Sequence, residues 1–252
     1  MSRDNLFYRY YDALFHDKDY TSETNLIFEL SRKFGIASPR KLLEVGCGTG
    51  NHTQELAKRG IPLVSIDIDK NMAALAKEKI KQSHVRIEHT RIEDLQDKNF
   101  DVIMALFNIV TYIPTVPELI SFMDGVAARL RRRGIFVFDC WNGVAAMKDP
   151  PRVKKVSVRH DNKTIDCTIT PKTDFFNQIT TLTYDFKVTD GSKIEKDSFS
   201  IPQILWTPMQ IRWAVEQSGL EVVLCSPFLG IKRPATQDDW KIMFCCRKPI
   251  VR

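Results

Sequence analysis

The stretch Lys41–Asn51, KLLEVGCGTGN, decides the fold of this chain of 252 residues. It begins with the short apolar run LLEV, which is typical of a buried strand in a parallel sheet. Gly46–Gly50 then carries three glycines, which let the chain turn sharply and let a ligand lie against main-chain atoms with no Cβ in the way. Helical periodicity follows over His52–Arg59. This order predicts a nucleotide-type binding unit; a tight turn without a ligand is the alternative.

The spacing of the glycines distinguishes between ligands. A dinucleotide-binding turn needs G-x-G-x-x-G, whereas this chain has G-x-G-x-G, and a P-loop needs Lys-Ser or Lys-Thr where Asn51-His52 stand. The segment EVGCGTG resembles the first motif of class I S-adenosylmethionine (SAM)-dependent methyltransferases. In that family the loop wraps the methionine and ribose part of SAM, which carries no phosphate. The resemblance implies cofactor contacts at Glu44, Gly46, Cys47 and Gly48.

A second apolar run, Ile61–Ile66, ends in an acid, Asp67. A carboxylate offers only acceptors, so an acid at the end of strand two can accept hydrogen bonds from both ribose hydroxyls. Asp67–Met72 resembles the second methyltransferase motif, with Asp67 as the ribose ligand and Ile68 and Met72 beside the cofactor. Asp69 is interpreted as the cap of the following helix.

The third strand, Val85–His89, is followed by the turn Thr90–Leu95. In the family this turn supplies an acid to the adenine amino group and an apolar residue to the ring face. Arg91 stands where the acid is usual, and Ile92 keeps the apolar contact. We therefore expect both residues at the adenine, with the backbone of Arg91 holding the base.

Candidates for the reaction centre follow strands four and five. Strand four, FDVIMAL, ends at Leu106, which is expected to contact the cofactor because ligands of open α/β sheets bind at such ends. Tyr11 and Tyr20 are expected at both the cofactor and the reaction centre. For Trp141, a place in the core is the alternative. The sequence singles out no base, and His160 is interpreted as a surface residue of a hairpin. The candidates to line the reaction centre are Tyr11, Tyr20, Asn108, Tyr112, Asp139 and Trp141, of which Tyr11, Asn108, Tyr112 and Trp141 are the catalytic candidates.

The periodicity of the chain changes after Pro150. Short alternating runs, separated by turn signals at Asp161-Asn162 and Asp190-Gly191, predict an antiparallel β insert. We expect a SAM-binding core with N-terminal helices over 1–149, the insert over 150–203 as acceptor lid or dimer contact, and the rest of the core over 204–252. The expected fold class is α/β, and the resemblance implies a Rossmann-like seven-stranded class I methyltransferase sheet in the order 3-2-1-4-5-7-6 with strand seven antiparallel, with which the count of elements agrees.

Composition narrows the class of protein. The chain has no apolar run of membrane-spanning length, and MSRDNLFYRYYD shows no signal peptide. Its six cysteines fit no zinc pattern, so we expect no metal and a reducing, cytoplasmic location. The net charge of +6 includes the basic stretch Arg152–Arg159, which either binds phosphate or guards an edge strand.

The resemblance extends over nearly the whole chain to bacterial methyltransferases that act on the amino group of nucleotide-linked deoxysugars. It rests on EVGCGTG, on the segments FNIVTY and FDCWN, on Tyr11-Asp12 with Lys18-Asp19-Tyr20, and on the insert. It implies a SAM-dependent methyltransferase with a small-molecule acceptor, a nucleotide sugar being the first candidate, no membrane or nucleic-acid partner, and a homodimer through the insert. The alternatives are an O- or N-methyltransferase of another metabolite, an RNA or protein methyltransferase, and a non-catalytic SAM-binding protein.

Overall fold

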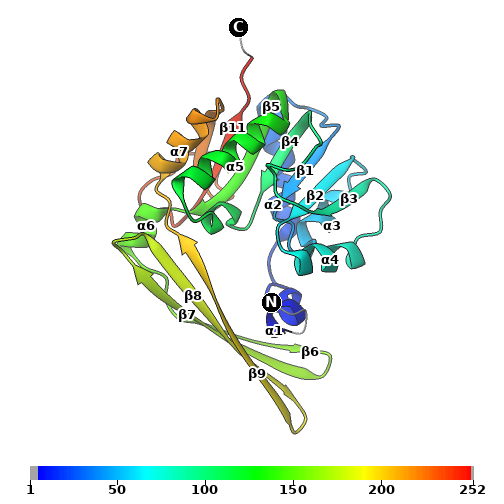
Figure 1. Ribbon diagram of the computed structural model, residues 1–252, viewed down its shortest axis with the longest axis vertical. Coiled ribbons are helices and arrows are strands. Elements are labelled where there is room, and N and C mark those ends of the chain that lie inside the picture. Colours follow the sequence, from blue (N-terminus) through cyan, green and yellow to red (C-terminus); the bar gives the residue numbers. More distant parts are fainter. Residues whose placement is uncertain (1–4, 251–252) are drawn as a thin grey trace.

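A seven-stranded sheet forms the body of the molecule, in the order β10-β11-β5-β4-β1-β2-β3 (Figure 1). The computed structural model describes residues 5–250. Residues 1–4, which begin the segment predicted to carry no signal peptide, and residues 251–252, which end the predicted core, lie outside the described residues. β11 runs antiparallel to β5 and β10, and the other pairs are parallel, which confirms the predicted order. The strands are β1 (Leu42–Val45), β2 (Leu63–Asp67), β3 (Val85–His89), β4 (Phe100–Ala105), β5 (Leu130–Trp141), β10 (Glu221–Pro227) and β11 (Lys241–Arg247).

Helices cover both faces of this sheet. α5 and α7 pack on one face, and α2 and α3 pack on the other. The largest fully buried side chains include Phe136, Phe138 and Phe244, whose rings stack at centroid distances of 4.8 and 5.1 Å. Each such ring stabilises the fold by about 1.5–3 kcal/mol through burial. The helices are α2 (Tyr20–Lys33), α3 (Asn51–Ala57), α4 (Lys70–Lys79), α5 (Val116–Arg129), α6 (Gly143–Lys148) and α7 (Pro208–Gln217), with a 3₁₀ turn η1 (Ile109–Tyr112).

Side-chain caps fix where several helices begin. Asp19 accepts from the backbone N–H of Ser22, and Asp69, the predicted cap, accepts from the N–H groups of Asn71 and Met72. Thr207 and Gln210 form a reciprocal capping box at the start of α7.

The insert is a second, four-stranded antiparallel sheet in the order β6-β7-β8-β9. Its strands are β6 (Lys154–His160), β7 (Lys163–Asp174), β8 (Ile179–Asp190) and β9 (Lys193–Ile204). β7 extends to Asp174 and β9 to Ile204, beyond the alternating runs of the sequence. Both strands stay paired with β8 up to its first residue, Ile179. The division of the chain into separate units stays a prediction.

Helix α1 (Leu6–Leu14) lies between the insert and the α/β core (Figure 1). One of its faces packs on the insert through Leu6, Tyr10 and Leu14, which join the apolar side chains of β7, β8 and β9. Arg9 pairs with Glu195 of β9 at 2.7 Å, and the N–H of Leu6 donates to Asp197 at 3.1 Å. The aromatic N-terminus therefore joins the insert to the core.

Candidate active site

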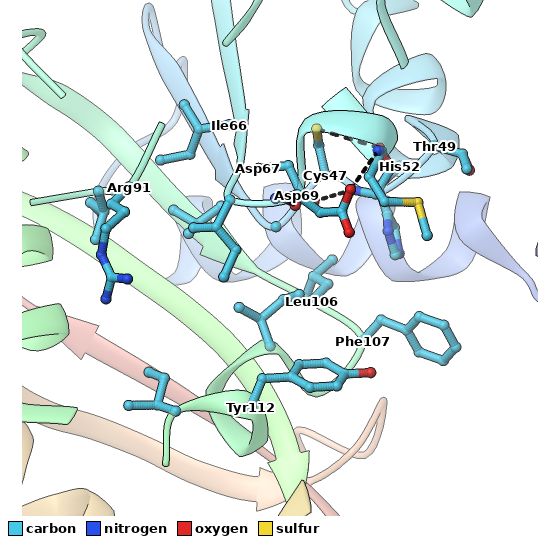
Figure 2. Close-up of a pocket in the computed structure, with 18 of the residues that line it drawn as sticks. Cys47, Thr49, His52, Ile66, Asp67, Asp69, Arg91, Leu106, Phe107 and Tyr112 are labelled. Carbon is cyan, nitrogen blue, oxygen red and sulfur yellow. Dashed lines mark hydrogen bonds between the residues drawn. The ribbon is translucent and has the colours of Figure 1, made fainter. Parts of the chain in front are cut away.

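A cavity of about 390 Å³ opens at the carboxyl ends of β1, β2 and β4, beside α1. Figure 2 shows Leu106, Phe107 and Tyr112 across from the glycine turn and Asp67, with Arg91 at the other end. This is the edge of an open α/β sheet at which ligands bind. From the predicted set the cavity lining contains Tyr11, Tyr20, Gly46, Cys47, Gly48, Asp67, Ile68, Met72, Arg91, Ile92, Leu106 and Tyr112.

The glycine turn has the left-handed backbone that its sequence requires. Gly46 has φ +73° and Gly48 has φ +56°, and the N–H groups of Gly46 and Cys47 both donate to the carbonyl of Ile66, at 2.8 and 3.0 Å. A Cβ on Gly48 would meet only the Tyr11 hydroxyl, at 4.0 Å, so the space in front of this backbone is open. The turn therefore offers main-chain atoms to a ligand, as SAM requires.

Asp67 presents a partly used carboxylate to the same cavity. Its Oδ2 accepts from the N–H of Gly48 at 2.7 Å and its Oδ1 from the N–H of Asp69 at 2.8 Å. The side chain is only 8% exposed, and burial raises the pKa of its carboxyl. A carboxylate has about four lone-pair sites, so acceptor capacity remains for the two hydroxyls of a ribose. The residues present thus fit the nucleoside part of SAM.

Glu44 does not line the cavity, contrary to the expected contact with the cofactor. Its carboxylate accepts from the hydroxyls of Thr53 at 2.6 Å and Ser65 at 2.8 Å, and the residue is 3% exposed. Burial raises the pKa of the Glu44 carboxyl. The side chain of Glu44 therefore ties α3 and β2 together beneath the turn.

The end of the cavity farthest from the glycine turn carries both charged and apolar side chains. The apolar side chains of Ile92 and Met72 are buried, whereas Ile68 is 66% exposed. Arg91 pairs with Glu93 at 3.5 Å, and both line the cavity. Two residues that sequence reasoning missed, Glu93 and Glu118, therefore bring carboxylates to this end, although position 91 has none.

Three tyrosines line the cavity, and all stay protonated at neutral pH. Burial raises the pKa of Tyr20 to about 12, and it raises the pKa values of Tyr11 and Tyr112 as well. Their hydroxyls donate hydrogen bonds but do not accept a proton at neutral pH. Tyr11, Tyr20 and Tyr112 therefore shape and orient, and none is a general base at that pH.

Two predicted catalytic residues, Asn108 and Trp141, do not line the cavity. Asn108 follows Phe107, and Phe107 takes the place in the lining instead. Trp141 packs edge-on against Trp240 with ring centroids 4.8 Å apart, so its contact is a packing contact away from the cavity lining. Asp139, another candidate for the reaction centre, is fully buried behind the lining and does not face the cavity either.

Phe7, His52 and Ile201 are among the further lining residues that sequence reasoning missed. Phe7 stands one helical turn before Tyr11, so the helical spacing could have placed both side chains on the same face of α1. His52 hydrogen-bonds Glu23 at 2.7 Å, and Glu23 also pairs with Lys18. Ile201 belongs to β9, which makes the insert itself part of the cavity wall.

The basic stretch Arg152–Arg159 lies away from this cavity. It belongs to β6 and the segment before it, and the sheet order puts β6 three strands from β9, or about 14 Å at ordinary strand spacing. None of its residues lines the cavity. His160 is half exposed at the end of β6 and also lies outside the lining. Across residues 5–250, no group of three or more metal-ligating side chains comes together, and no helix is long and apolar enough to span a bilayer.

Known proteins resemble this chain in sequence over part of its length and in fold over nearly all of it. Residues 42–134 match a family described as methyltransferase domain. One curated relative, a dTDP-3-amino-3,4,6-trideoxy-alpha-D-glucopyranose N,N-dimethyltransferase of Streptomyces venezuelae, is 27% identical over 124 residues, which are 49% of this chain and 52% of the relative. The chain thus spans about half the length of the curated relatives it matches.

Two solved structures match almost the whole fold. A SAM-dependent methyltransferase from Clostridium acetobutylicum superposes with a TM-score of 0.81 at 18% identity, over 97% of this chain and 98% of the other. SAM-bound CalS10, an amino pentose methyltransferase from Micromonospora echinaspora, gives 0.76 at 22% identity, over 97% and 99%. Residues 42–134 of this chain thus match a methyltransferase-domain family, and the chain as a whole shares the Rossmann-like fold of these solved methyltransferases.

Proposed function

We propose that this chain is a SAM-dependent methyltransferase that acts on a small-molecule acceptor. The observation that carries the proposal is the meeting of Asp67 and the open backbone of Gly48 in one cavity, at the carboxyl edge of the sheet. When bound, SAM supplies a methyl group on a positively charged sulfur. Asp67 would hold the ribose, the turn Gly46–Gly48 the methionine part, and Ile92 with Met72 the adenine.

The residues of this chain would act by placement and by exclusion of water. Phe7 and Tyr11 of α1 cover the cavity, and Tyr112 stands opposite on η1. Methyl transfer is an in-line displacement, so holding the acceptor in line with the methyl group supplies much of the rate. Aromatic faces suit this task because they give large, rigid contact areas.

The proton of an amine acceptor must leave before or outside the transfer step. The lining tyrosines stay protonated at neutral pH, and the carboxylate of Asp139 faces backbone N–H groups and not the cavity. We infer that the acceptor reaches the methyl group as the neutral amine. An amine of lower pKa should then react at lower pH than an amine of higher pKa.

The finer proposal is that the acceptor is the amino group of a nucleotide-linked sugar. It is supported by the names of the dTDP-aminosugar relatives and of the amino pentose methyltransferase of similar fold. Phe7, Tyr112 and Ile201 give the cavity an apolar wall with a polar tip on the insert side, which suits a sugar ring. No residue of Arg152–Arg159 lines the cavity, so this stretch does not support the proposal.

A panel of acceptors with methyl-labelled SAM tests the proposal. It should contain nucleotide-linked amino sugars, the matching free amino sugars, simple amines, phenols, and transfer RNA and peptide as macromolecular competitors. Turnover of an amino sugar, free or nucleotide-linked, supports the proposal. Turnover of phenols alone would make the chain an O-methyltransferase, and turnover of RNA or peptide alone would overturn the small-molecule class.

We further propose a homodimer through the insert and a cytoplasmic location. The cytoplasmic proposal rests on the six cysteines, all of which are free thiols in the structure. For the dimer, the available surface is the face of the second sheet turned away from α1, which carries Thr168, Thr181 and Thr183. Sedimentation of the purified protein distinguishes a dimer from a monomer.

A further inference from the structure

The buried carboxylate of Asp139 holds one turn of the cavity wall without touching the cavity. Asp139 stands near the end of β5 and has no exposed surface. Its Oδ1 accepts from the N–H of Phe107 at 2.6 Å and its Oδ2 from the N–H of Asn108 at 3.1 Å. Lys241 of the neighbouring strand β11 completes the site with an ion pair at 2.9 Å.

The turn that Asp139 holds has an unfavourable backbone. Phe107 and Asn108 have φ +68° and +63°, two consecutive left-handed residues of which neither is glycine. Each such residue costs on the order of 1–3 kcal/mol, and the cost is greater for a bulky ring than for asparagine. The Asn108 side-chain oxygen is buried without a hydrogen-bond partner among residues 5–250, so that oxygen does not hold the turn. The two bonds to Asp139 oppose the strain, together with the bonds that the carbonyl of Asn108 accepts from the N–H and the hydroxyl of Thr111 at 3.0 and 2.6 Å.

The turn decides where several lining side chains point. Leu106 and Phe107 lie directly before and within it, and Ile109 begins the 3₁₀ turn η1 that follows. Ile109 fills the space in front of Gly46, where a Cβ would lie 2.3 Å from its Cδ1. Tyr112 ends the same 3₁₀ turn and also lines the cavity. Relaxation of Phe107-Asn108 would therefore displace the wall that faces the glycine turn.

We propose that Asp139 is a positioning residue: by holding the left-handed turn Phe107-Asn108, it sets the affinity of the cavity for the nucleoside ligand without contacting that ligand. This proposal rests on the proposed function, since the ligand is the cofactor of that function. If the turn relaxes in most molecules, the apparent affinity is the intrinsic affinity multiplied by the fraction of molecules that keep the competent shape.

The test combines one disruptive variant with a backbone rescue. Asp139→Asn keeps the size of the side chain but turns an amide NH₂ group toward one of the two backbone N–H groups. Adding Asn108→Gly places at position 108 a residue that adopts φ +63° without strain, so the turn depends less on Asp139. Asp101→Asn is the matched control, because Asp101 is also a buried carboxylate that accepts from two consecutive backbone N–H groups, those of Arg40 and Lys41 at 2.7 and 3.0 Å, but it lies outside the cavity lining. Calorimetry with S-adenosylhomocysteine measures affinity, thermal unfolding measures stability, and amide hydrogen exchange reports on the N–H groups of Phe107 and Asn108.

We expect Asp139→Asn to bind S-adenosylhomocysteine at least tenfold more weakly and to exchange both N–H groups faster. The double variant should return to within about threefold of the wild type, and Asp101→Asn should lower the unfolding temperature while keeping its affinity within the same range. Unchanged affinity in Asp139→Asn, or a loss that glycine does not restore in a folded double variant, would overturn the proposal.

Two further outcomes have a defined meaning. If Asp139→Asn alone does not fold, the double variant decides: folding with near-normal affinity supports the proposal, and failure to fold or to bind overturns it. If the wild type itself binds no S-adenosylhomocysteine, the proposed function fails, and the inference fails with it. Hydrogen exchange then shows separately whether Asp139 holds the turn.

Discussion

The side chain of Ile109 fills the space directly in front of Gly46. A Cβ at position 46 would lie 2.3 Å from Ile109 Cδ1 and 2.7 Å from Ile109 Cγ1, far inside van der Waals contact. The glycine turn after β1 and the turn after β4 are thus fitted to each other across the cavity. Gly46 is needed for its missing side chain as well as for its backbone angle of φ +73°.

Gly46→Ala should therefore weaken binding of S-adenosylhomocysteine at least tenfold, because the new methyl group pushes Ile109 out of place. Gly60→Ala is the matched control: Gly60 also has a left-handed backbone, φ +66°, but a Cβ there meets nothing within 4 Å. Both variants carry a backbone cost of about 1–2 kcal/mol. Calorimetry should show near-normal affinity for Gly60→Ala, and equal losses in the two variants would mean that the contact with Ile109 does not matter.

Asp12 holds α1 to the core beside the cavity. It accepts from the Thr49 hydroxyl at 2.5 Å and the Asn51 amide at 3.0 Å, and it pairs with Lys79 at 2.6 Å. Asp12→Ala should loosen α1 and speed dissociation of S-adenosylhomocysteine by about three- to tenfold, since partly exposed contacts of this kind are worth about 1 kcal/mol. Stopped-flow displacement measures the rate.

The control for this prediction is Asp17→Ala, which removes the same charge from an exposed position just after α1. An unchanged dissociation rate in Asp12→Ala would mean that α1 does not govern exit of the ligand. An equal increase in Asp17→Ala would attribute the effect to net charge and not to the contacts of Asp12.

The raised pKa of Asp67 predicts how binding depends on pH. Burial favours the protonated carboxyl, so its pKa lies above the ordinary value of 3.8. The ribose contacts require the carboxylate, so affinity for S-adenosylhomocysteine should begin to fall on acidification at a pH where an ordinary aspartate is still charged. Asp67→Asn should bind more weakly at neutral pH and show a flatter profile. A wild-type profile as flat as that of Asp67→Asn would contradict the assignment.

Ile201 tests whether the insert forms part of the acceptor site. It lines the cavity from β9, next to the residues of α1 that cover it. Ile201→Ala should raise KM for the acceptor several-fold and change the affinity for S-adenosylhomocysteine less. Ile194→Ala, on the same strand but 56% exposed and outside the lining, should change neither. An equal loss of both affinities in Ile201→Ala would make the insert part of the cofactor site as well.

Much of the fold could be predicted from local sequence patterns. The glycine turn, the strand ending in Asp67 and the caps Asp19, Asp69 and Thr207 are all encoded within a few neighbouring residues. The order of the seven strands came from the resemblance, and the structure confirms it. Such features are predictable because backbone angles and hydrogen bonds of short range determine them.

The direction in which a side chain points at the end of a strand could not be predicted in the same way. Glu44 is placed beneath the turn by Thr53 and Ser65, and only the packing of α3 and β2 brings those hydroxyls together. Phe107 lines the cavity where Asn108 was expected, because the left-handed turn held by Asp139 rotates the chain. Phe7 and Ile201 meet at one cavity although nearly two hundred residues separate them in the chain.

The most direct test of the account is the affinity of Asp67→Ala for S-adenosylhomocysteine, measured by calorimetry on folded protein. Asp124→Ala, which removes an exposed carboxylate from α5, is the control for charge. Hydrogen bonds to a charged group are worth roughly 1.5–3 kcal/mol, so the account predicts at least a tenfold loss for Asp67→Ala and none for Asp124→Ala. Equal affinity of wild type and Asp67→Ala, or no binding by the wild type, would contradict the claim that this cavity holds SAM.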